Sequence, residues 1–550
     1  MGRNKSYNKM IYVAIIIVMA LFAFIGVGTL LSKNHPISQK SLDDLYAGVS
    51  MVAADQVKGS VNLTDKSLYD ELPDISKSPL AVEGHGDIAL EVFSSSEKSG
   101  TGHESWLIDV ANEFNSAGIK TSAGKTVSIS VRSVPSGLGA DYIISKKYLP
   151  DLYAPSNKLL GEYINSQSGS SVTEVTSRLV GNTAGILITK GKGYSDFDSV
   201  VEAVKNNEIN LGYTNPQTSS TGINFLMTFL SKVDKTNLTS DLAASEFSKF
   251  QNNIPFVADT TMQMRDSATT GSLDGMVMEY QTYINEQNLK SNYDFIPFGV
   301  RHDNPLYITS KASGKEEAVN LFKDFALNND MQKLATEKGF NANNDYKSEI
   351  SVTGAEVSQA LQLYKQNKDS GKDVIAVFVA DCSGSMAGDA INQLKDSLSN
   401  GVNYINGKNY VGLVSYSSKV TIELPIAKFD LNQRSYFQGS VNRLTATGST
   451  ATYEAITVAL KMIKDAKVSN PDAKTMIFLL SDGLANGKYS LNTIENVLKE
   501  EETPIYTISY TSAADKNAMN ALSSVNEAAS INADSDDIIY KIKSLFNSHM

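Results

Sequence analysis

The hydrophobic pattern changes along the chain and predicts three kinds of structure. Residues 11–31 are uncharged and almost entirely apolar, and a helix of this length spans about 31 Å, which matches the hydrocarbon core of a membrane. Residues 87–346 alternate β-rich runs with amphipathic helical runs. From residue 373 onward, apolar runs of strand length alternate with helical patterns, as in a parallel sheet that is buried on both faces. We therefore predict an α/β protein with a transmembrane helix and two globular domains.

Positive charge precedes the first apolar run. Arg3, Lys5 and Lys9 lie just before it, and the positive-inside rule then keeps the N-terminus in the cytoplasm. A cleaved signal peptide is the alternative, but the run is long and the small-residue cleavage pattern after it is poor. We expect an uncleaved, single-pass anchor at 11–31 in the cell membrane, a cytoplasmic tail at 1–10, and an extracytoplasmic position for the rest of the chain.

Shifts in composition suggest the other boundaries. Residues 32–84 are mostly polar, with one modest helical pattern, and we interpret them as a stalk. The first globular domain is expected at 85–346, followed by a polar, glycine-containing linker at 347–372. Residues 373–550 are expected to form a doubly wound, Rossmann-like sheet, and ligands of such sheets bind beyond the carboxyl ends of the strands.

Charge and cysteine content exclude several functions. Basic residues number 49 and acidic residues 60, which gives a net charge of −11. A general nucleic-acid binder needs a basic surface, so that class is disfavoured. A single cysteine, Cys382, rules out a disulfide within the chain, an iron–sulfur cluster and a cysteine-based zinc site. The five histidines are scattered without ligand spacing, so a histidine-rich metal centre is not expected.

Oxygen-bearing side chains gather where two strands of the second domain are predicted to end. One strand ends at Asp381 and another at Asp482, so both carboxylates should lie at the same edge of the sheet. Ser383 and Ser385 follow the first of these strands, and Thr450 comes just before a helix. Hard oxygen ligands suit Mg²⁺, Mn²⁺ or Ca²⁺ and do not suit zinc or copper. An α/β domain with polar loops and no metal is the alternative.

The D-x-S-x-S sequence, the distal threonine and the distal Asp-Gly pair resemble the von Willebrand factor type A domain and its metal-ion-dependent adhesion site (MIDAS). The resemblance covers residues 373–550 and implies that Ser383 and Ser385 ligate the metal directly. Thr450 would reach the metal directly or through water. Asp381 and Asp482 would act through water or hydrogen bonds. A further implication is an open coordination position for a Glu or Asp of a protein partner.

The first globular domain resembles bacterial extracellular solute-binding proteins, which have a two-lobed, periplasmic-binding-protein-like α/β fold. The resembling passages are IALEVFSSSEK, LGYTNPQTSSTGINFL, SLDGMVMEY and PLYITSKASGKEEAVNLFKDFAL. Two hydroxyl-rich loops in them suggest a site for a small oxyanion or carboxylate, because helix N-termini offer unpaired N–H groups. The candidate ligand-binding residues are Ser94, Ser95, Ser96, Thr218, Ser219, Ser220 and Thr221.

These hydroxyls also have a plainer interpretation as helix caps. Arg265 and Glu279 are further candidates for the cleft, although we favour a solvated surface position for each. The choice between ligand binding and capping needs the tertiary structure.

Two hypotheses about function follow. The leading one is a membrane-anchored bacterial surface protein that binds a protein partner, as in adhesion, through the divalent cation. The alternative is a tethered, transport-associated receptor for a small solute, anionic if the loops act as described. An enzyme is not expected, because no nucleophile–base pair, paired histidines or phosphate loop occurs at workable spacing.

Overall fold

A computed structural model describes residues 41–532, apart from 62–66, 170, 268–272, 484, 511–513, 527 and 529. The predicted cytoplasmic tail and the predicted anchor lie outside the described residues. Within the part that is described, no helix is long and apolar enough to cross a membrane. The first described element is the short helix α2 (Leu42–Ala47), where the Ser41 hydroxyl and the Asp44 carboxylate cap each other's backbone N–H groups.

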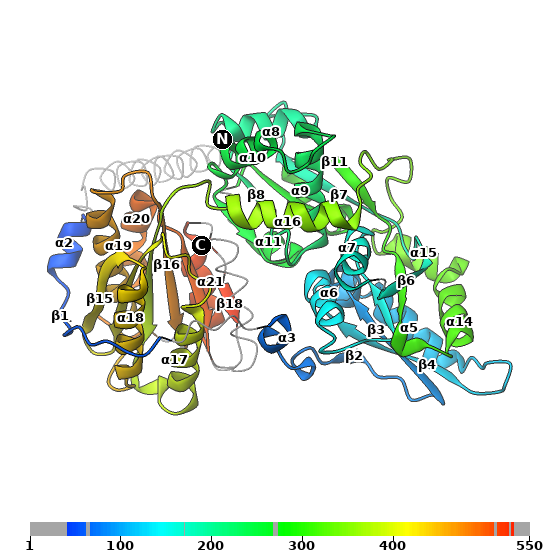
Figure 1. Cartoon of the computed structure of the whole chain (residues 1–550), viewed down its shortest axis with the longest axis horizontal. Coiled ribbons are helices and arrows are strands. Elements are labelled where there is room, and N and C mark those ends of the chain that lie inside the picture. Colours follow the sequence, from blue (N-terminus) through cyan, green and yellow to red (C-terminus); the bar gives the residue numbers. More distant parts are fainter. Residues whose placement is uncertain are drawn as a thin grey trace, which may run out of the picture. The chain divides into compact units, whose positions relative to one another are not determined.

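The first globular domain contains two mixed sheets, as the predicted two-lobed α/β fold requires (Figure 1). The chain crosses between the sheets after β6 and again after β11, so two short segments join the lobes. The first sheet consists, in spatial order, of β2 (Leu80–Val82), β4 (Val127–Ser133), β3 (Ile88–Ser94), β5 (Leu152–Ala154), β12 (Leu306–Thr309) and β6 (Val172–Thr176). The second consists of β11 (Tyr293–His302), β7 (Asn182–Thr189), β10 (Gly275–Glu279), β8 (Leu211–Thr214) and β9 (Phe256–Ala258).

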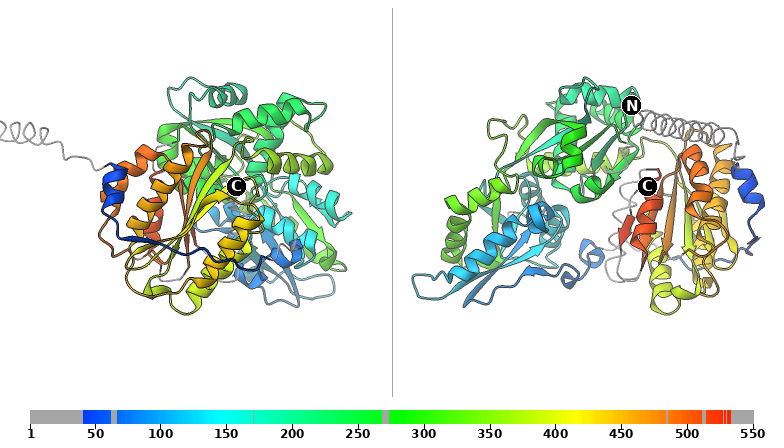
Figure 2. Two further views of the ribbon diagram at one scale, coloured as in Figure 1. Left: turned by 60° about the vertical axis from the view of Figure 1, so that its left-hand side comes forward. Right: turned by 180° about the vertical axis from the view of Figure 1, so that it is seen from behind.

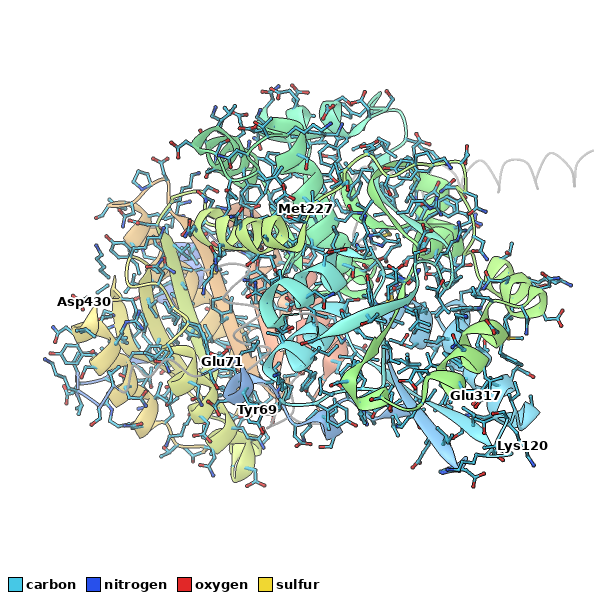
Figure 3. The ribbon with its side chains drawn as sticks, turned by 45° about the vertical axis from the view of Figure 1, so that its right-hand side comes forward. Tyr69, Glu71, Lys120, Met227, Glu317 and Asp430 are labelled. Atoms are coloured by element: carbon cyan, nitrogen blue, oxygen red, sulfur yellow. The ribbon has the colours of Figure 1, made fainter. Side chains whose placement is uncertain are left out.

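Helices alternate with these strands, in agreement with the hydrophobic pattern. The most deeply buried of these helices is α9 (Ser220–Val233), in which every residue from Ser220 to Leu230 is buried and which carries Met227 (Figure 3).

A loop of the first sheet is held by helix α14 (Glu316–Ala326). The Glu317 carboxylate accepts a hydrogen bond of 2.6 Å from the Ser122 backbone N–H, in the loop that follows Lys120 (Figure 3). The helices are α3 (Leu68–Glu71), α4 (Ser96–Ser99), α5 (Trp106–Ala117), α6 (Ser136–Ser145), α7 (Leu159–Ser168), α8 (Phe197–Lys205), α9, α10 (Asp241–Gln251), α11 (Thr261–Ser267), α12 (Tyr280–Asn285), α13 (Gln287–Asn292), α14 (Glu316–Ala326) and α15 (Asn329–Glu337).

The linker expected at 347–372 contains a helix of the first domain. Thr353 caps α16 (Gly354–Asn367) in a reciprocal capping box with Glu356. The helix packs against α7, α9 and α10, and its apolar side buries Val357, Ala360 and Tyr364. The polar composition of this range reflects the exposed side of an amphipathic helix.

The second domain is built on one seven-stranded sheet whose central strands are parallel, as predicted. All eight residues of β13 are buried, so both faces of the sheet are covered. In spatial order the strands are β1 (Met51–Ala53), β15 (Val420–Lys428), β14 (Tyr410–Tyr416), β13 (Val374–Asp381), β16 (Lys474–Ser481), β17 (Ile505–Ser509) and β18 (Ser530–Asn532). The helices are α17 (Asp389–Gly401), α18 (Leu431–Arg443), α19 (Thr452–Lys467), α20 (Leu491–Glu501) and α21 (Lys516–Ser524).

One strand of this sheet comes from the range interpreted as a stalk, 32–84. Strand β1 forms one edge of the sheet and pairs in parallel with β15, and the chain then continues along α18 (Figures 1 and 2). The Ala54 N–H donates to the Ile422 carbonyl at 2.9 Å, and the Gly59 N–H donates to the Ser435 carbonyl at 2.7 Å. Another strand from the same range, β2, joins the first sheet of the other domain. Residues 49–61 therefore form a clasp on the second domain, although the rest of that domain begins only at 374.

The clasp depends on a close approach of two glycines. A Cβ atom on Gly439 of α18 would lie 1.9 Å from the Val57 carbonyl oxygen, and one on Gly59 would lie 2.6 Å from the Gly439 nitrogen. We expect Gly439→Ala to displace the clasp and to speed amide exchange at Ala54 by about tenfold or more, since such overpacking costs about 1–3 kcal/mol. Hydrogen–deuterium exchange measures this rate. Gly407→Ala is the matched control, because its Cβ would have its nearest neighbour at 3.7 Å; equal exchange in both variants would contradict the prediction.

Candidate functional site

The candidate metal site begins where β13 ends, at Asp381. This carboxylate is fully buried and accepts three hydrogen bonds. The Ser383 N–H donates to Oδ1 at 2.9 Å, while the Ser481 and Tyr416 hydroxyls donate to Oδ2 at 2.6 and 3.1 Å. Burial raises the pKa of Asp381, with a further contribution from the charge of Asp482, and the hydrogen bonds from Ser383 and Ser481 oppose the rise. Asp381 is thus a rigidly held acceptor with a neighbouring negative charge.

The hydroxyls of Ser383 and Ser385 lie next to each other in the following loop. Their Oγ atoms are 3.0 Å apart and share a hydrogen bond in which either hydroxyl can be the donor. Two adjacent ligands of an octahedral Mg²⁺, each bonded at about 2.1 Å, are also separated by about 3.0 Å. Ser383 is buried whereas Ser385 is exposed. The pair therefore fits two neighbouring positions of a small cation that remains open toward solvent on one side.

Backbone and side-chain hydrogen bonds bring the other two loops to this place. The Gly384 N–H donates to the Gly448 carbonyl at 3.0 Å, which joins the serine loop to the loop that carries Thr450. The Thr450 N–H donates to Asn486 Oδ1 at 2.6 Å, and the Asn486 N–H donates back to the Thr450 carbonyl at 3.0 Å. Asn486 belongs to the loop that begins at Asp482. Thr450 and Asp482 are both buried, so the three sequence-predicted loops converge at one edge of the sheet.

Three residues that hold this arrangement were missed by the sequence analysis. Ser481 and Tyr416 anchor the Asp381 carboxylate, and Asn486 joins two loops. A signal existed for Tyr416, which ends β14 directly opposite Asp381 in the parallel pair. Ser481 is the residue before Asp482. No local pattern marks Asn486, because its role depends on a loop that is remote in the sequence.

The donor set is poor in charge. In the ranges that the structure describes, no group of three or more His, Cys, Asp and Glu side chains could hold a metal ion. The candidate site instead combines two carboxylates with three hydroxyls. Oxygen donors of this kind match Mg²⁺, Mn²⁺ or Ca²⁺. A cation held by few charges keeps a strong attraction for an additional carboxylate.

Cys382, between Asp381 and Ser383, faces the core. Its side chain is 6% exposed. Burial, with the charges of Asp381 and Glu423, raises the pKa of its thiol to about 12. The thiol is therefore protonated and unreactive while the loop is folded, and Cys382 acts as a small packed side chain.

The hydroxyl-rich loops of the first domain meet at a small cavity of about 20 Å³. Ser95, Ser96, Thr218, Ser219 and Ser220 line it, whereas Ser94 and Thr221 do not. Ser219 also caps α9, since its hydroxyl accepts hydrogen bonds from the Thr221 and Gly222 N–H groups at 3.2 and 3.4 Å. Ser219 therefore combines the capping role with a place in the cavity lining.

Carboxylates also line this cavity, and of these only Glu279 was considered for the cleft from the sequence. Glu97, Asp259 and Glu279 contribute to the lining. The surface position favoured for Glu279 is wrong, because Glu279 is 1% exposed. Arg265 is not part of the lining and forms an ion pair of 2.5 Å with Glu104. A lining of three carboxylates disfavours the oxyanion that the helix N-terminus alone suggested.

Comparison with known families supports the two-domain description. A model of the von Willebrand factor type A domain matches residues 376–546. A model of the bacterial extracellular solute-binding protein family matches residues 99–341. No curated protein matches the chain significantly in sequence.

Solved structures resemble each domain separately. A von Willebrand factor type A structure from Catenulispora acidiphila is 15% identical, with a TM-score of 0.30, over 32% of this chain and 42% of that chain. The sulfate-binding protein SubI from Mycobacterium tuberculosis H37Rv is 13% identical, with a TM-score of 0.36, over 51% of this chain and 91% of that chain. A periplasmic thiamin binding protein is 14% identical, with a TM-score of 0.39, over 51% of this chain and 96% of that chain.

Proposed function

We propose that this chain, which carries a type A domain and an extracellular solute-binding domain, binds a protein partner through a divalent cation. Ser383 and Ser385 would hold the cation, with Thr450 beside them and Asp381 and Asp482 behind. When bound, the cation supplies a positive charge and a coordination position for a partner's Glu or Asp. The observation that carries the proposal is the 3.0 Å separation of the two serine hydroxyls.

The order of burial in the site favours recognition of a partner. Asp381, Ser383, Thr450 and Asp482 are buried, and Ser385 is exposed. A cation bound by these buried groups would keep its remaining coordination positions open toward solvent. A carboxylate buried at an interface is costly without a counter-charge, so a waiting cation gives both affinity and specificity. The proposal is of a binding protein rather than an enzyme, since none of these groups is arranged as a nucleophile with a base.

The proposed location is the outer side of the cell membrane. The apolar run at 11–31 would be the single anchor, with residues 1–10 in the cytoplasm and the two domains outside. A nearly cysteine-free chain is stable in such a place without depending on thiol chemistry. Surface exposure would give the cation site access to partners on other cells or in the surrounding medium.

The test is cation-dependent capture of a partner. The chain is immobilised and exposed to solubilised surface proteins of the native cell, once with MgCl₂ and once with EDTA. We expect partner binding in magnesium that is lost in EDTA and in the Ser385→Ala variant, since Ser385 is exposed and its loss should leave the fold intact. Ser418→Ala, in a neighbouring loop, is less suitable as a control because its hydroxyl supports Ser449. Asp465→Asn, on the exposed side of α19, is the matched control and should bind normally. Equal capture in magnesium and EDTA would sink the proposal.

A second candidate function is the capture of a small solute by the first domain. The observation that favours it is the cavity between hydroxyl-rich loops of the two lobes, since sites in two-lobed proteins form where the lobes meet. The two functions are compatible in one chain, because the cavity and the cation site use different residues. Saturable binding of a solute that survives EDTA would support this second function.

A further inference from the structure

The lining of the first-domain cavity is acidic. It includes Glu97, Asp259 and Glu279, and no Lys, Arg or His occurs among its described lining residues. A buried basic group, Lys98, adjoins the lining: its ammonium group lies 3.6 Å from Glu97 Oε1 and donates to Ser95 Oγ. Lys98 is fully buried and committed to these partners. Glu97 and Glu279 thus adjoin a single ammonium group, and acidic residues outnumber basic ones among the described lining residues of the cavity.

Glu279 is only half satisfied. Its Oε1 atom accepts a hydrogen bond of 2.6 Å from the Thr221 hydroxyl and lies 3.2 Å from His302 Nδ1. Its Oε2 atom is buried and has no hydrogen-bond partner among the residues that the structure describes. Ser220 lines the same cavity, and its Oγ atom is also buried without a partner in the described part of the chain. Buried polar atoms without partners are costly, so two of them on one cavity indicate that a ligand supplies the missing contacts.

The neighbours of His302 determine which of its ring nitrogens accepts a hydrogen bond. The Nδ2 groups of Asn157 and Asn224 lie 3.0 and 3.2 Å from His302 Nε2. Backbone contacts fix the orientation of both amides: Asn157 Oδ1 accepts from the Leu159 N–H, and Asn224 Oδ1 accepts from the Val300 N–H. The two amides therefore donate to Nε2, which must be an acceptor. The ring proton is on Nδ1, where it donates to Glu279.

We propose that this cavity binds the primary ammonium group of a small cationic solute, with Glu279 Oε2 and Ser220 Oγ as its acceptors. The inference rests on the second candidate function and names the chemical class of its ligand. A cavity of about 20 Å³ holds one water-sized group, and a primary ammonium group is of that size. Its three N–H groups can donate to the two oxygens that have no partner among the described residues, and its positive charge complements the acidic lining. An oxyanion, by contrast, has no N–H group to donate to these oxygens, and the lining carboxylates would repel its negative charge.

The test is calorimetric titration of the full chain, in EDTA so that the cation site is silent. The probes are 1,4-diaminobutane, tetramethylammonium chloride and sodium sulfate. We expect saturable binding of the diamine and none of tetramethylammonium, which has the charge but no N–H group. Glu279→Gln keeps the shape and the Oε1 contacts, and should weaken diamine binding about tenfold or more. Glu113→Gln, an exposed carboxylate on α5, is the matched control and should leave the affinity unchanged.

Each other outcome overturns the inference in a recognisable way. Binding of sulfate without binding of the diamine would keep solute capture and reject the ammonium ligand. Absence of binding for all three probes would reject the inference. Diamine binding that is equal in Glu279→Gln and in the unsubstituted chain would place the amine elsewhere. Far-ultraviolet circular dichroism of Glu279→Gln, compared with the unsubstituted chain, separates loss of binding from loss of fold.

Discussion

Asp381→Asn is expected to weaken cation binding by the type A domain about 10- to 100-fold while the domain stays folded. The substitution keeps the shape of the side chain but removes its charge and one of its two acceptor oxygens. Asp381 Oδ2 accepts from both the Ser481 and Tyr416 hydroxyls, and these can turn to accept from an amide instead. Groups that support metal ligands from behind have effects of this size on affinity. Titration of the full chain with Mn²⁺, followed by electron paramagnetic resonance, measures the affinity.

Two controls accompany this measurement. Asp465→Asn removes an exposed carboxylate from α19, where it pairs with Lys461 at 2.7 Å, and should bind Mn²⁺ as the unsubstituted chain does. The only cysteine, Cys382, provides a test of folding, since its buried thiol should react slowly with a thiol reagent in both variants. Unchanged Mn²⁺ affinity in Asp381→Asn would show that Asp381 does not support a cation.

Phe478→Ala is expected to destabilise the type A domain by about 3–5 kcal/mol. Phe478 is fully buried in β16 and faces Phe378 of β13 on one side and Tyr506 of β17 on the other. The ring centroids are 5.1 and 5.5 Å apart, and both pairs are stacked. Removing the middle ring leaves a cavity in the centre of the sheet and breaks two aromatic contacts. Val468→Ala, at a side chain that is 83% exposed, should cost far less.

The chain contains a separate probe for each domain. The single tryptophan, Trp106, is buried in the first domain, and the single cysteine lies in the type A domain. In a urea titration, Phe478→Ala should shift the exposure of Cys382 to lower urea and leave the Trp106 fluorescence transition in place. A shift of the Trp106 transition alone, or of neither probe, would contradict the predicted role of Phe478.

The hydrophobic pattern of the sequence was sufficient to predict the type A sheet, because the core strands of this sheet are short and apolar throughout. The run DVIAVFVAD predicts a buried parallel strand that ends at Asp381, and β13 is such a strand. Local pattern failed for β1, which is three residues long and lies in a polar range. Its partner, β15, lies more than 360 residues further along the chain, so only long-range pairing reveals the strand. Similarly, α16 was taken for a linker because its exposed side dominates its composition.

The sequence by itself determined that Asp381 and Asp482 lie at the same edge of the type A sheet, whereas the hydroxyls of Tyr416 and Ser481 that hold Asp381 became apparent only in the structure. Parallel strands present their carboxyl ends at one edge of a sheet, so residues that end two such strands share that edge, and Asp381 and Asp482 are close because β13 and β16 pair directly. Only the tertiary structure decided the character of the first-domain cavity. Glu279 lies at the end of a strand like many surface glutamates, and its burial depends on loops of both lobes that close around it. The charge of this cavity depends on carboxylates that come from segments remote in the sequence, and no local sequence pattern shows that these segments meet.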